Sequence, residues 1–198
     1  MIIASHCVFA AYGFWLPNDP RGSWSNEVWA EHLQPFGDVH KVSTRRSLAR
    51  APHDRNIVRQ AKDAMLFPPV RFNDAQRQAI ADGFAEIVPI LGLTIYACAI
   101  LQDHVHIVSA RYRENIETII GFLKRAATRR LNQQDVHPLS GYRRADGIIP
   151  TPWVRGGWKR YLDSVEEIAQ AIEYVRSNPH RAGLPGQRYA FETELRWT

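Results

Sequence analysis

The chain has 198 residues, of which 45% are apolar and 11% aromatic, so it can build one sizeable core but is too short for two full domains. Its net charge of +5 and sequence pI of about 9.5 favour an anionic partner, without deciding between nucleic acid and an acidic membrane surface. No apolar run approaches the ~20 residues needed to span a bilayer, and the first residues lack a basic signal region. We therefore expect a cytoplasmic protein with no membrane partner.

The N-terminal third combines one clear strand with a long irregular segment. Residues 2–12 are apolar and free of Gly and Pro, which predicts a buried strand that ends at Gly13. An irregular insertion follows at about 14–73, rich in proline and aromatic residues, and we expect it to pack through its aromatics and to carry function or short helices. Cys7 and Cys98 lie in strand-like stretches without CxxC spacing, so we expect buried, reduced thiols.

The middle of the chain has the clearest periodicity. A helix is predicted over 75–91, capped by Asn73 or Asp74 and stopped by Gly92. Two strands over 93–101 and 104–110 follow, joined at Gln102–Asp103. A second helix, opened by Asn115 or Glu114, continues to about Leu131 with its apolar stripe on one side and its basic residues mostly on others.

The C-terminal third contributes a strand and a helix. Residues 135–152 read as a loop, and a short strand over 153–162 is interrupted by Gly156–Gly157. A third helix is predicted over 165–177, ended by Asn178–Pro179. The order of elements favours an α+β fold, an antiparallel sheet covered by helices, within a single domain spanning 1–198.

Two short patterns carry the candidate chemistry. His104 and His106 stand two positions apart in a strand, so both imidazoles share a face and can bind one cation, while Val105 points into the core. Tyr174 and Asn178 stand four positions apart in a helix and also share a face. Each pattern has an ordinary alternative: the histidines as polar residues on the solvent face of a strand, and the tyrosine as a residue at the edge of the core.

These patterns, in their order and separation, resemble the HUH single-tyrosine transposases, and more narrowly the REP-associated tyrosine transposases. The resemblance spans about 96–185, with a looser match at 12–22, and rests on the following segments: His104-Val105-His106, the run 122–132, and the run 173–184 around Tyr174 and Asn178. Two departures are an extra glycine at Gly156–Gly157 and a longer insertion between Gly13 and Asn73.

The resemblance implies a ferredoxin-like HUH endonuclease fold and a defined reaction. His104, His106 and Asn178 would bind Mg²⁺ or Mn²⁺, although imidazole ligands also admit Zn²⁺, Co²⁺ or Ni²⁺. Tyr174 would attack single-stranded DNA, giving a 5′-phosphotyrosine and a free 3′-OH, at sites flanked by a hairpin or REP-like repeat. Asp103 and Glu173 would at most orient these groups, and the family includes both monomers and homodimers.

Basic residues extend around the candidate site, and we expect some of them to contact DNA phosphates. A solvated basic surface is the alternative. Five tryptophans could stack bases, or could instead hold their segments to the core: Trp15, Trp24, Trp29, Trp153 and Trp158. The expected DNA-binding residues are Lys124, Arg125, Arg129, Arg130, Arg155, Lys159 and Arg181.

Two other functions compete with the transposase reading. A domesticated, non-catalytic DNA-binding relative would share the basic surface but would not need the histidines and Tyr174 to converge. A metal-dependent nuclease that uses water would leave Tyr174 structural. Histidine-triad hydrolases require a third histidine two residues on, where this chain has Val108, and the paired His-x-Ser/Thr motifs of two-histidine phosphoesterases are absent from the sequence.

Overall fold

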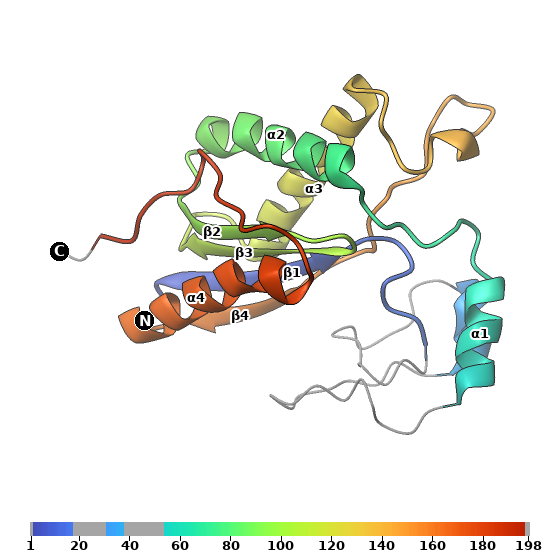
Figure 1. Cartoon of the computed structure of the whole chain (residues 1–198), viewed down its shortest axis with the longest axis horizontal. Coiled ribbons are helices and arrows are strands. Elements are labelled where there is room, and N and C mark those ends of the chain that lie inside the picture. The colour runs from blue at the N-terminus through green and yellow to red at the C-terminus, as the bar shows by residue number, and fades with distance from the viewer. Residues whose placement is uncertain (1, 18–30, 38–53, 197–198) are drawn as a thin grey trace.

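The fold is built on a four-stranded antiparallel sheet, seen in a computed structural model that describes residues 2–17, 31–37 and 54–196 (Figure 1). The strand order is β2-β3-β1-β4, so the first and third strands of the chain lie at the centre. The predicted α+β class, an antiparallel sheet covered by helices, is confirmed. The strands are β1 (Ala4–Ala10), β2 (Ile95–Ile100), β3 (His104–Ala110) and β4 (Trp158–Leu162).

Alternation along the central strands sends apolar side chains to both faces of the sheet. Cys7, Phe9, Val105 and Ile107 are fully buried on one face, in the larger of the two clusters of the core. A second cluster, which includes Val108, lies on the opposite face. Because both faces are covered, most positions of the central strands are apolar, and the polar residues among them are serines and histidines. Cys7 and Cys98 are free, buried thiols, as expected.

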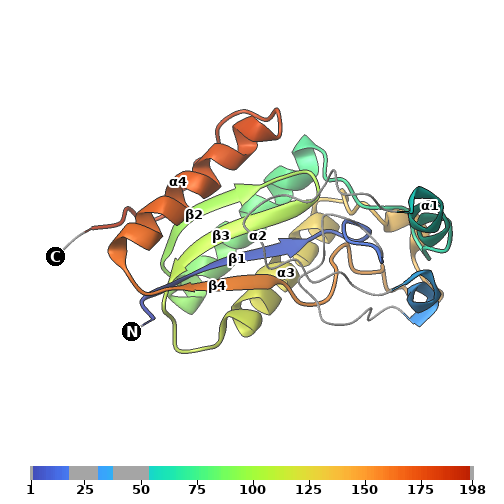
Figure 2. The same ribbon diagram turned by 90° about the horizontal axis from the view of Figure 1, so that it is seen from below.

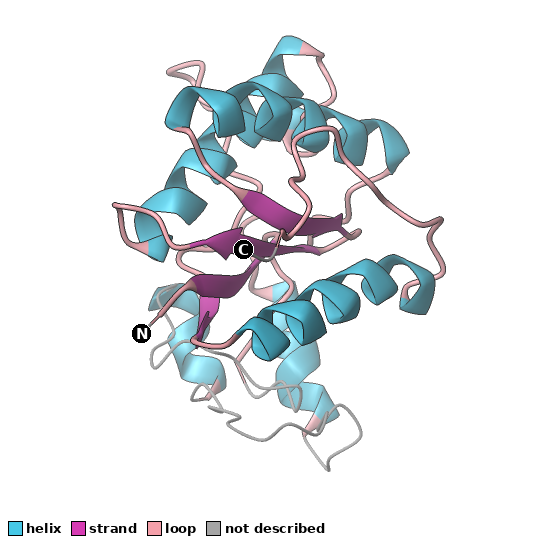
Figure 3. Cartoon of the chain, turned by 90° about the vertical axis from the view of Figure 1, so that its left-hand side faces the viewer, coloured by secondary structure: helices cyan, strands magenta, loops and turns pink. Residues whose placement is uncertain are grey.

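Helices α2 (Asp74–Leu91) and α3 (Ile116–Gln133) cover the first face (Figures 1 and 3). Asn73 caps α2 in a capping box with Gln76, and Asn115 caps α3 through the N–H of Thr118. Gly92 ends α2 in the left-handed conformation, as the sequence predicted.

Helix α4 (Val165–Arg181) packs against the other face, over β2 and β3 (Figure 2). The prediction that Asn178–Pro179 ends this helix was wrong, because the helix continues to Arg181. The end is set instead by Gly183, which has a φ of 71°, and by the N–H of Leu184, which donates to the carbonyl of Pro179 at 2.8 Å. A proline this close to the C-terminal end removes one N–H but does not prevent the final turn.

The segment after α4 follows the outer edge of β2. Gln187 donates to the carbonyl of Ile100 and accepts from its N–H, and Thr193 donates to the carbonyl of Ile95 at 2.7 Å. The rings of Tyr189 and Phe191 stack on each other, and Phe191 also meets the ring of Phe84 in α2 edge to face. The segment thereby pairs the backbone groups of a strand edge that would otherwise be open.

The insertion contributes two short helices among its described residues, a 3₁₀ helix at Glu31–Phe36 and α1 (Arg55–Asp63), which Asp54 caps. The insertion also carries four basic residues and two tryptophans that lie outside the described residues: Lys41, Arg45, Arg46, Arg50, Trp24 and Trp29. The predicted strand over 153–162 is shorter than expected, since Trp153 makes only an isolated bridge to Ala11 before β4 begins. A short 3₁₀ turn at Ser140–Tyr142 interrupts the predicted loop. None of the helices in the described part of the chain has the length and apolar character that crossing a bilayer requires.

Candidate functional site

Three histidines share the face of the sheet that α4 covers. His104 and His106 project from β3 to the same side, with ring centroids 4.8 Å apart, as the i, i+2 spacing predicts. The register of β1 against β3 places Val8 opposite His106, so His6 is a diagonal neighbour of His106 on that face. The sheet therefore brings a third imidazole to the pair.

His6 contacts His106 directly. The Nε2 atom of His6 lies 3.2 Å from Nδ1 of His106, and the two rings stack with centroids 5.4 Å apart. Trp158 meets His6 edge to face at 5.1 Å. Burial lowers the pKa of His6 to about 4, with a further contribution from Arg160, and burial followed by the neighbouring His104 and His6 holds the pKa of His106 well below its usual value. Both rings are therefore neutral at physiological pH.

His104 is held by two neighbours. Its Nδ1 lies 2.7 Å from a carboxylate oxygen of Asp103, the residue just before β3. The ring of Phe14, from the segment that follows β1, lies 4.9 Å from it. This contact is consistent with the expectation that Asp103 orients a residue of the site, here His104.

Tyr174 places its ring over the histidines. It meets His106 at 5.7 Å and His6 at 5.9 Å between ring centroids, both with steeply tilted planes. Tyr174 is nonetheless 44% exposed, and the guanidinium of Arg181 lies 5.4 Å from the centroid of its ring. Tyr174 is therefore an exposed aromatic side chain seated on buried, neutral imidazoles.

Asn178 lies one helical turn beyond Tyr174 and is 8% exposed. Helix α4 starts next to Leu162, which pairs with Ala4, and Ala4 in turn pairs with Ala110 at the far end of β3. The helix therefore runs from the Ala110 end of β3 toward the His104 end. Four helical residues rise about 6 Å and two strand residues about 6.8 Å, so the step from Tyr174 to Asn178 matches the step from His106 to His104.

The donor set fits a divalent cation with open coordination positions. Within the described residues, no hydrogen bond involves Nε2 of His104 or of His106, and Nδ2 of the buried Asn178 amide has no partner. Rotating that amide by half a turn would present its oxygen instead. Among the described residues, no group of three or more His, Cys, Asp or Glu side chains is arranged to hold a metal, so a metal site here would need the Asn178 amide as its third ligand.

The expected DNA-binding cations divide between the two faces of the sheet. Arg181 lies beside Tyr174, whereas Lys124 belongs to α3 on the opposite face and donates to the carbonyls of Val154 and Gly156 at 2.7 and 2.5 Å. Burial lowers the pKa of Lys124 to about 8. Lys124 thus holds the loop before β4 in place.

The remaining cations of this set are also not gathered at Tyr174. Arg129 and Arg130 pair with Glu86 of α2 at 3.2 and 2.9 Å. Lys159 pairs with Glu117 of α3, and the guanidinium of Arg125 lies 4.9 Å from the ring centroid of Phe122. Arg155 lies in the loop before β4. The structure therefore brings one of the seven expected cations, Arg181, into contact with Tyr174.

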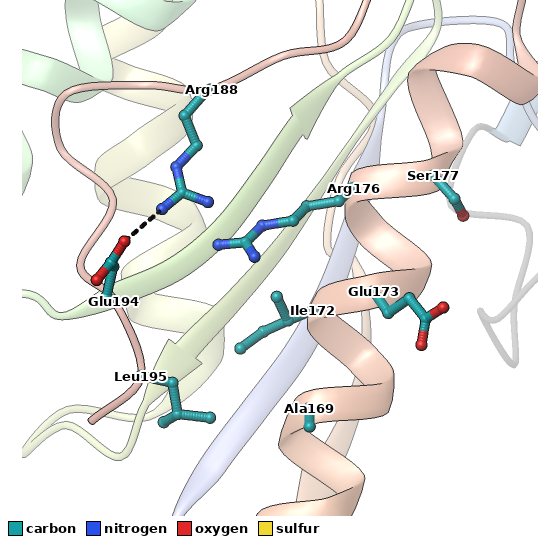
Figure 4. Close-up of a pocket in the computed structure, with 8 residues that line it drawn as sticks. All are labelled: Ala169, Ile172, Glu173, Arg176, Ser177, Arg188, Glu194 and Leu195. Atoms are coloured by element: carbon teal, nitrogen blue, oxygen red, sulfur yellow. Dashed lines mark ion pairs between the residues drawn. The ribbon is translucent and has the colours of Figure 1, made fainter. Parts of the chain in front are cut away.

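A pocket of about 640 Å³ lies between α4 and the C-terminal segment. In Figure 4, Arg176 and Ile172 point from α4 toward the segment that carries Arg188 and Glu194, and the latter two form an ion pair at 3.7 Å. Neither Tyr174 nor the histidines line it, and its two arginines are matched by two glutamates. The pocket is thus separate from the candidate site.

Comparisons with known proteins give little beyond the structure itself. No family model matches the chain, and no curated protein matches it. Among solved structures, the chain is similar to the structure of a REP-associated tyrosine transposase bound to a REP hairpin, with a TM-score of 0.48 and 10% identity. The match covers 92% of this chain and 69% of that chain.

The residue that sequence reasoning missed is His6. Its one signal was a titratable side chain in a predicted strand whose other residues are apolar except for Ser5. The sequence does not say which strand pairs with which, so it could not place His6 next to His106. Trp153 and Trp158, considered for base stacking, instead pack within the protein, the first against Phe9 and Phe72 and the second against His6.

Proposed function

We propose that this chain is a metal-dependent endonuclease and strand transferase of single-stranded DNA, which cleaves and rejoins DNA through a 5′-phosphotyrosine. The observation that carries the proposal is the position of Tyr174, an exposed phenol seated on His6 and His106. The resemblance of the HUH and Tyr-x-x-x-Asn patterns to the single-tyrosine transposases supports it. The contact between Tyr174 and His106 is the convergence that a purely DNA-binding protein would not require.

The residues of the site have separate roles in this reaction. The hydroxyl oxygen of Tyr174 forms a bond to a backbone phosphorus while the bond to the 3′ oxygen breaks, and that oxygen leaves as a 3′-OH after taking up a proton. Arg181, beside the ring, would hold the phosphate. His104, His106 and Asn178 would hold Mg²⁺ or Mn²⁺, which would polarise the phosphate and favour the phenolate. The reverse attack by a 3′-OH rejoins the strand without ATP.

A tyrosine suits joining better than hydrolysis. The covalent intermediate conserves the bond energy of the phosphodiester and keeps the cut end in place. A water-derived nucleophile would lose both. This is why we assign strand transfer at hairpin-flanked sites, as in the resembled family, and not degradation of DNA.

The test is incubation of the protein with hairpin-flanked single-stranded DNA, labelled at its 5′ or 3′ end, and Mn²⁺. We expect the wild type to become covalently joined to the 5′ phosphate of the fragment downstream of the cut, which carries the 3′ label, and to release the upstream fragment with a free 3′-OH. We expect Tyr174→Phe and His106→Ala to form no adduct. Tyr161→Phe is the matched control, because Tyr161 is equally exposed at 45% but lies on β4 with its side chain on the other face of the sheet.

Two outcomes would overturn the proposal. Cleavage that survives Tyr174→Phe would indicate a nuclease that uses water. DNA binding without cleavage, across a broad set of hairpins and with both Mg²⁺ and Mn²⁺, would indicate the domesticated DNA-binding alternative.

A further inference from the structure

Both histidines expected to bind the cation have their Nδ1 atoms engaged. Nδ1 of His104 lies 2.7 Å from the carboxylate of Asp103, and Nδ1 of His106 lies 3.2 Å from Nε2 of His6. The ring nitrogen left on each histidine is Nε2. The two rings stand on one face of the sheet with their centroids 4.8 Å apart.

The two partners differ in what they can do. A carboxylate can only accept, so the ring of His104 must carry its proton on Nδ1, which leaves a lone pair on Nε2. An imidazole can donate or accept, so the contact between His6 and His106 has two arrangements. In one, Nδ1–H of His106 donates to Nε2 of His6 and leaves a lone pair on Nε2 of His106. In the other, His6 donates, the proton of His106 sits on its Nε2, and that ring cannot bind a metal.

We propose that His6 is a positioning residue that accepts the Nδ1–H of His106 and thereby keeps Nε2 of His106 free to bind the cation. This inference rests on the metal site of the proposed function. With this arrangement both His104 and His106 carry an Nε2 lone pair, which is what binding of one cation by the two rings requires. Metal-binding histidines commonly hold their tautomer through such a partner.

The same contact argues against His6 as a third ligand. Its Nε2 lone pair is used by His106 and cannot also serve a cation. Its ring is 6% exposed, and it is enclosed by Trp158 and Tyr174 at 5.1 and 5.9 Å, in addition to the stacked ring of His106. A buried ring fixed on several sides is suited to orient its neighbour.

The first arm of the test is the tautomer in the metal-free protein. Long-range ¹H–¹⁵N spectra of ¹⁵N-labelled protein distinguish protonated from unprotonated ring nitrogens, and His6 and His106 are assigned by their absence in the His6→Gln and His106→Ala variants. We expect a protonated Nδ1 and an unprotonated Nε2 in His106, and an unprotonated Nε2 in His6. A proton on Nε2 of His6 would overturn the proposal.

The second arm is Mn²⁺ affinity, measured from the electron paramagnetic resonance signal of the free ion. His6→Phe keeps a planar ring but accepts no hydrogen bond, so we expect affinity to fall about 10- to 100-fold. His6→Gln keeps an acceptor, so we expect its affinity to stay within about threefold of the wild type. Unchanged affinity in His6→Phe would overturn the proposal, provided that circular dichroism shows the variant to be folded.

The two arms separate this inference from the proposed function. The same ¹H–¹⁵N spectra are recorded after addition of Zn²⁺. A change in the Nε2 signal of His6 that reports metal coordination, in place of its contact to His106, would make His6 a ligand and overturn the positioning role. A wild type that binds no Mn²⁺ would overturn the metal-dependent function, whereas the tautomers in the metal-free protein would still decide the role of His6.

Discussion

The phenol ring of Tyr174 meets the imidazole of His106 edge to face, with ring centroids 5.7 Å apart. The contact joins the last helix of the chain to a central strand of the sheet, and it places an exposed hydroxyl-bearing ring over a buried polar one. Histidines on a covered sheet face carry a desolvation cost, as the lowered pKa values of His6 and His106 indicate. Residues retained at such a cost are candidates for function.

Arg181 and Arg130 should differ in their effect on DNA binding. Arg181 lies beside Tyr174, whereas Arg130 pairs with Glu86 at 2.9 Å on the opposite face of the sheet. We expect Arg181→Gln to weaken binding of hairpin-flanked single-stranded DNA and to reduce the slope of log affinity against log salt by about 0.7. Arg130→Gln should leave that slope unchanged.

Fluorescence anisotropy across a series of NaCl concentrations measures both slopes. The Arg130 variant is the matched control, since it removes the same charge. If the two variants lose affinity equally, the DNA path extends over α3. That outcome would support the prediction that the basic residues of α3 contact DNA phosphates.

The local parts of the site were predictable from the sequence because they depend on one element at a time. The spacing of His104 and His106 in a strand, and of Tyr174 and Asn178 in a helix, fixes a shared face without knowledge of the partners. The caps at Asn73 and Asn115 are local in the same sense, because each is a bond between residues three positions apart.

The parts that failed depend on contacts between distant segments. His6 joins the site only because β1 lies beside β3, and no periodicity reports that pairing. The basic residues of α3 were expected to contact DNA phosphates, which stays a prediction. Their place on the face of the sheet opposite Tyr174 could not be read from the sequence, because the face on which a helix packs follows from its connection to the sheet. The end of α4 is an exception, because this wrong prediction was local. Pro179 was expected to stop the helix, whereas the left-handed residue that ends it is Gly183.

Substitution by alanine should change the free energy of unfolding in opposite directions at Gly83 and Gly121. A Cβ on Gly83 of α2 would lie 2.7 Å from the backbone oxygen of Ala126 in α3, and backbone cannot yield cheaply. We expect Gly83→Ala to destabilise the protein by about 1–3 kcal/mol. A Cβ on Gly121 would meet only the end of the Arg125 side chain at 3.4 Å, so Gly121→Ala should stabilise by about 0.5–1 kcal/mol. Urea unfolding measures both, and destabilisation by Gly121→Ala would contradict the helix packing described.

Acid should destabilise the protein through its buried histidines, and His137 isolates the effect away from the site. Burial, then Arg143, lowers its pKa from 6.5 to about 4. Between these values the unfolded chain binds a proton at His137 and the folded chain does not, so stability falls as the pH falls from 6.5 to 4. The contribution of this residue is at most about 3 kcal/mol, and it is fully lost only below pH 4.

His137→Asn removes the titration while keeping an acceptor for the N–H of Leu139, which His137 Nδ1 accepts at 3.2 Å. Unfolding free energies measured by urea between pH 7 and pH 4 should therefore depend less steeply on pH in the variant. Identical pH dependence in the two proteins would show that folding does not lower the pKa of His137.

Asn178 should separate metal binding from stability. Its buried amide nitrogen has no hydrogen-bond partner among the described residues, so Asn178→Ala removes no such bond, and we expect the free energy of unfolding to change by less than about 1 kcal/mol. Loss of an oxygen ligand should weaken Mn²⁺ binding at least as much as loss of an outer partner does, about 10-fold or more. Asn115→Ala is the reverse control: it removes the cap of α3, costs about 1 kcal/mol, and lies outside the donor set, so Mn²⁺ affinity should hold. Electron paramagnetic resonance titration gives the Mn²⁺ affinity of each variant, and urea unfolding gives its free energy of unfolding. If Asn178→Ala keeps the Mn²⁺ affinity of the wild type, this amide is not a ligand, and the two histidines lack the third donor assigned to them.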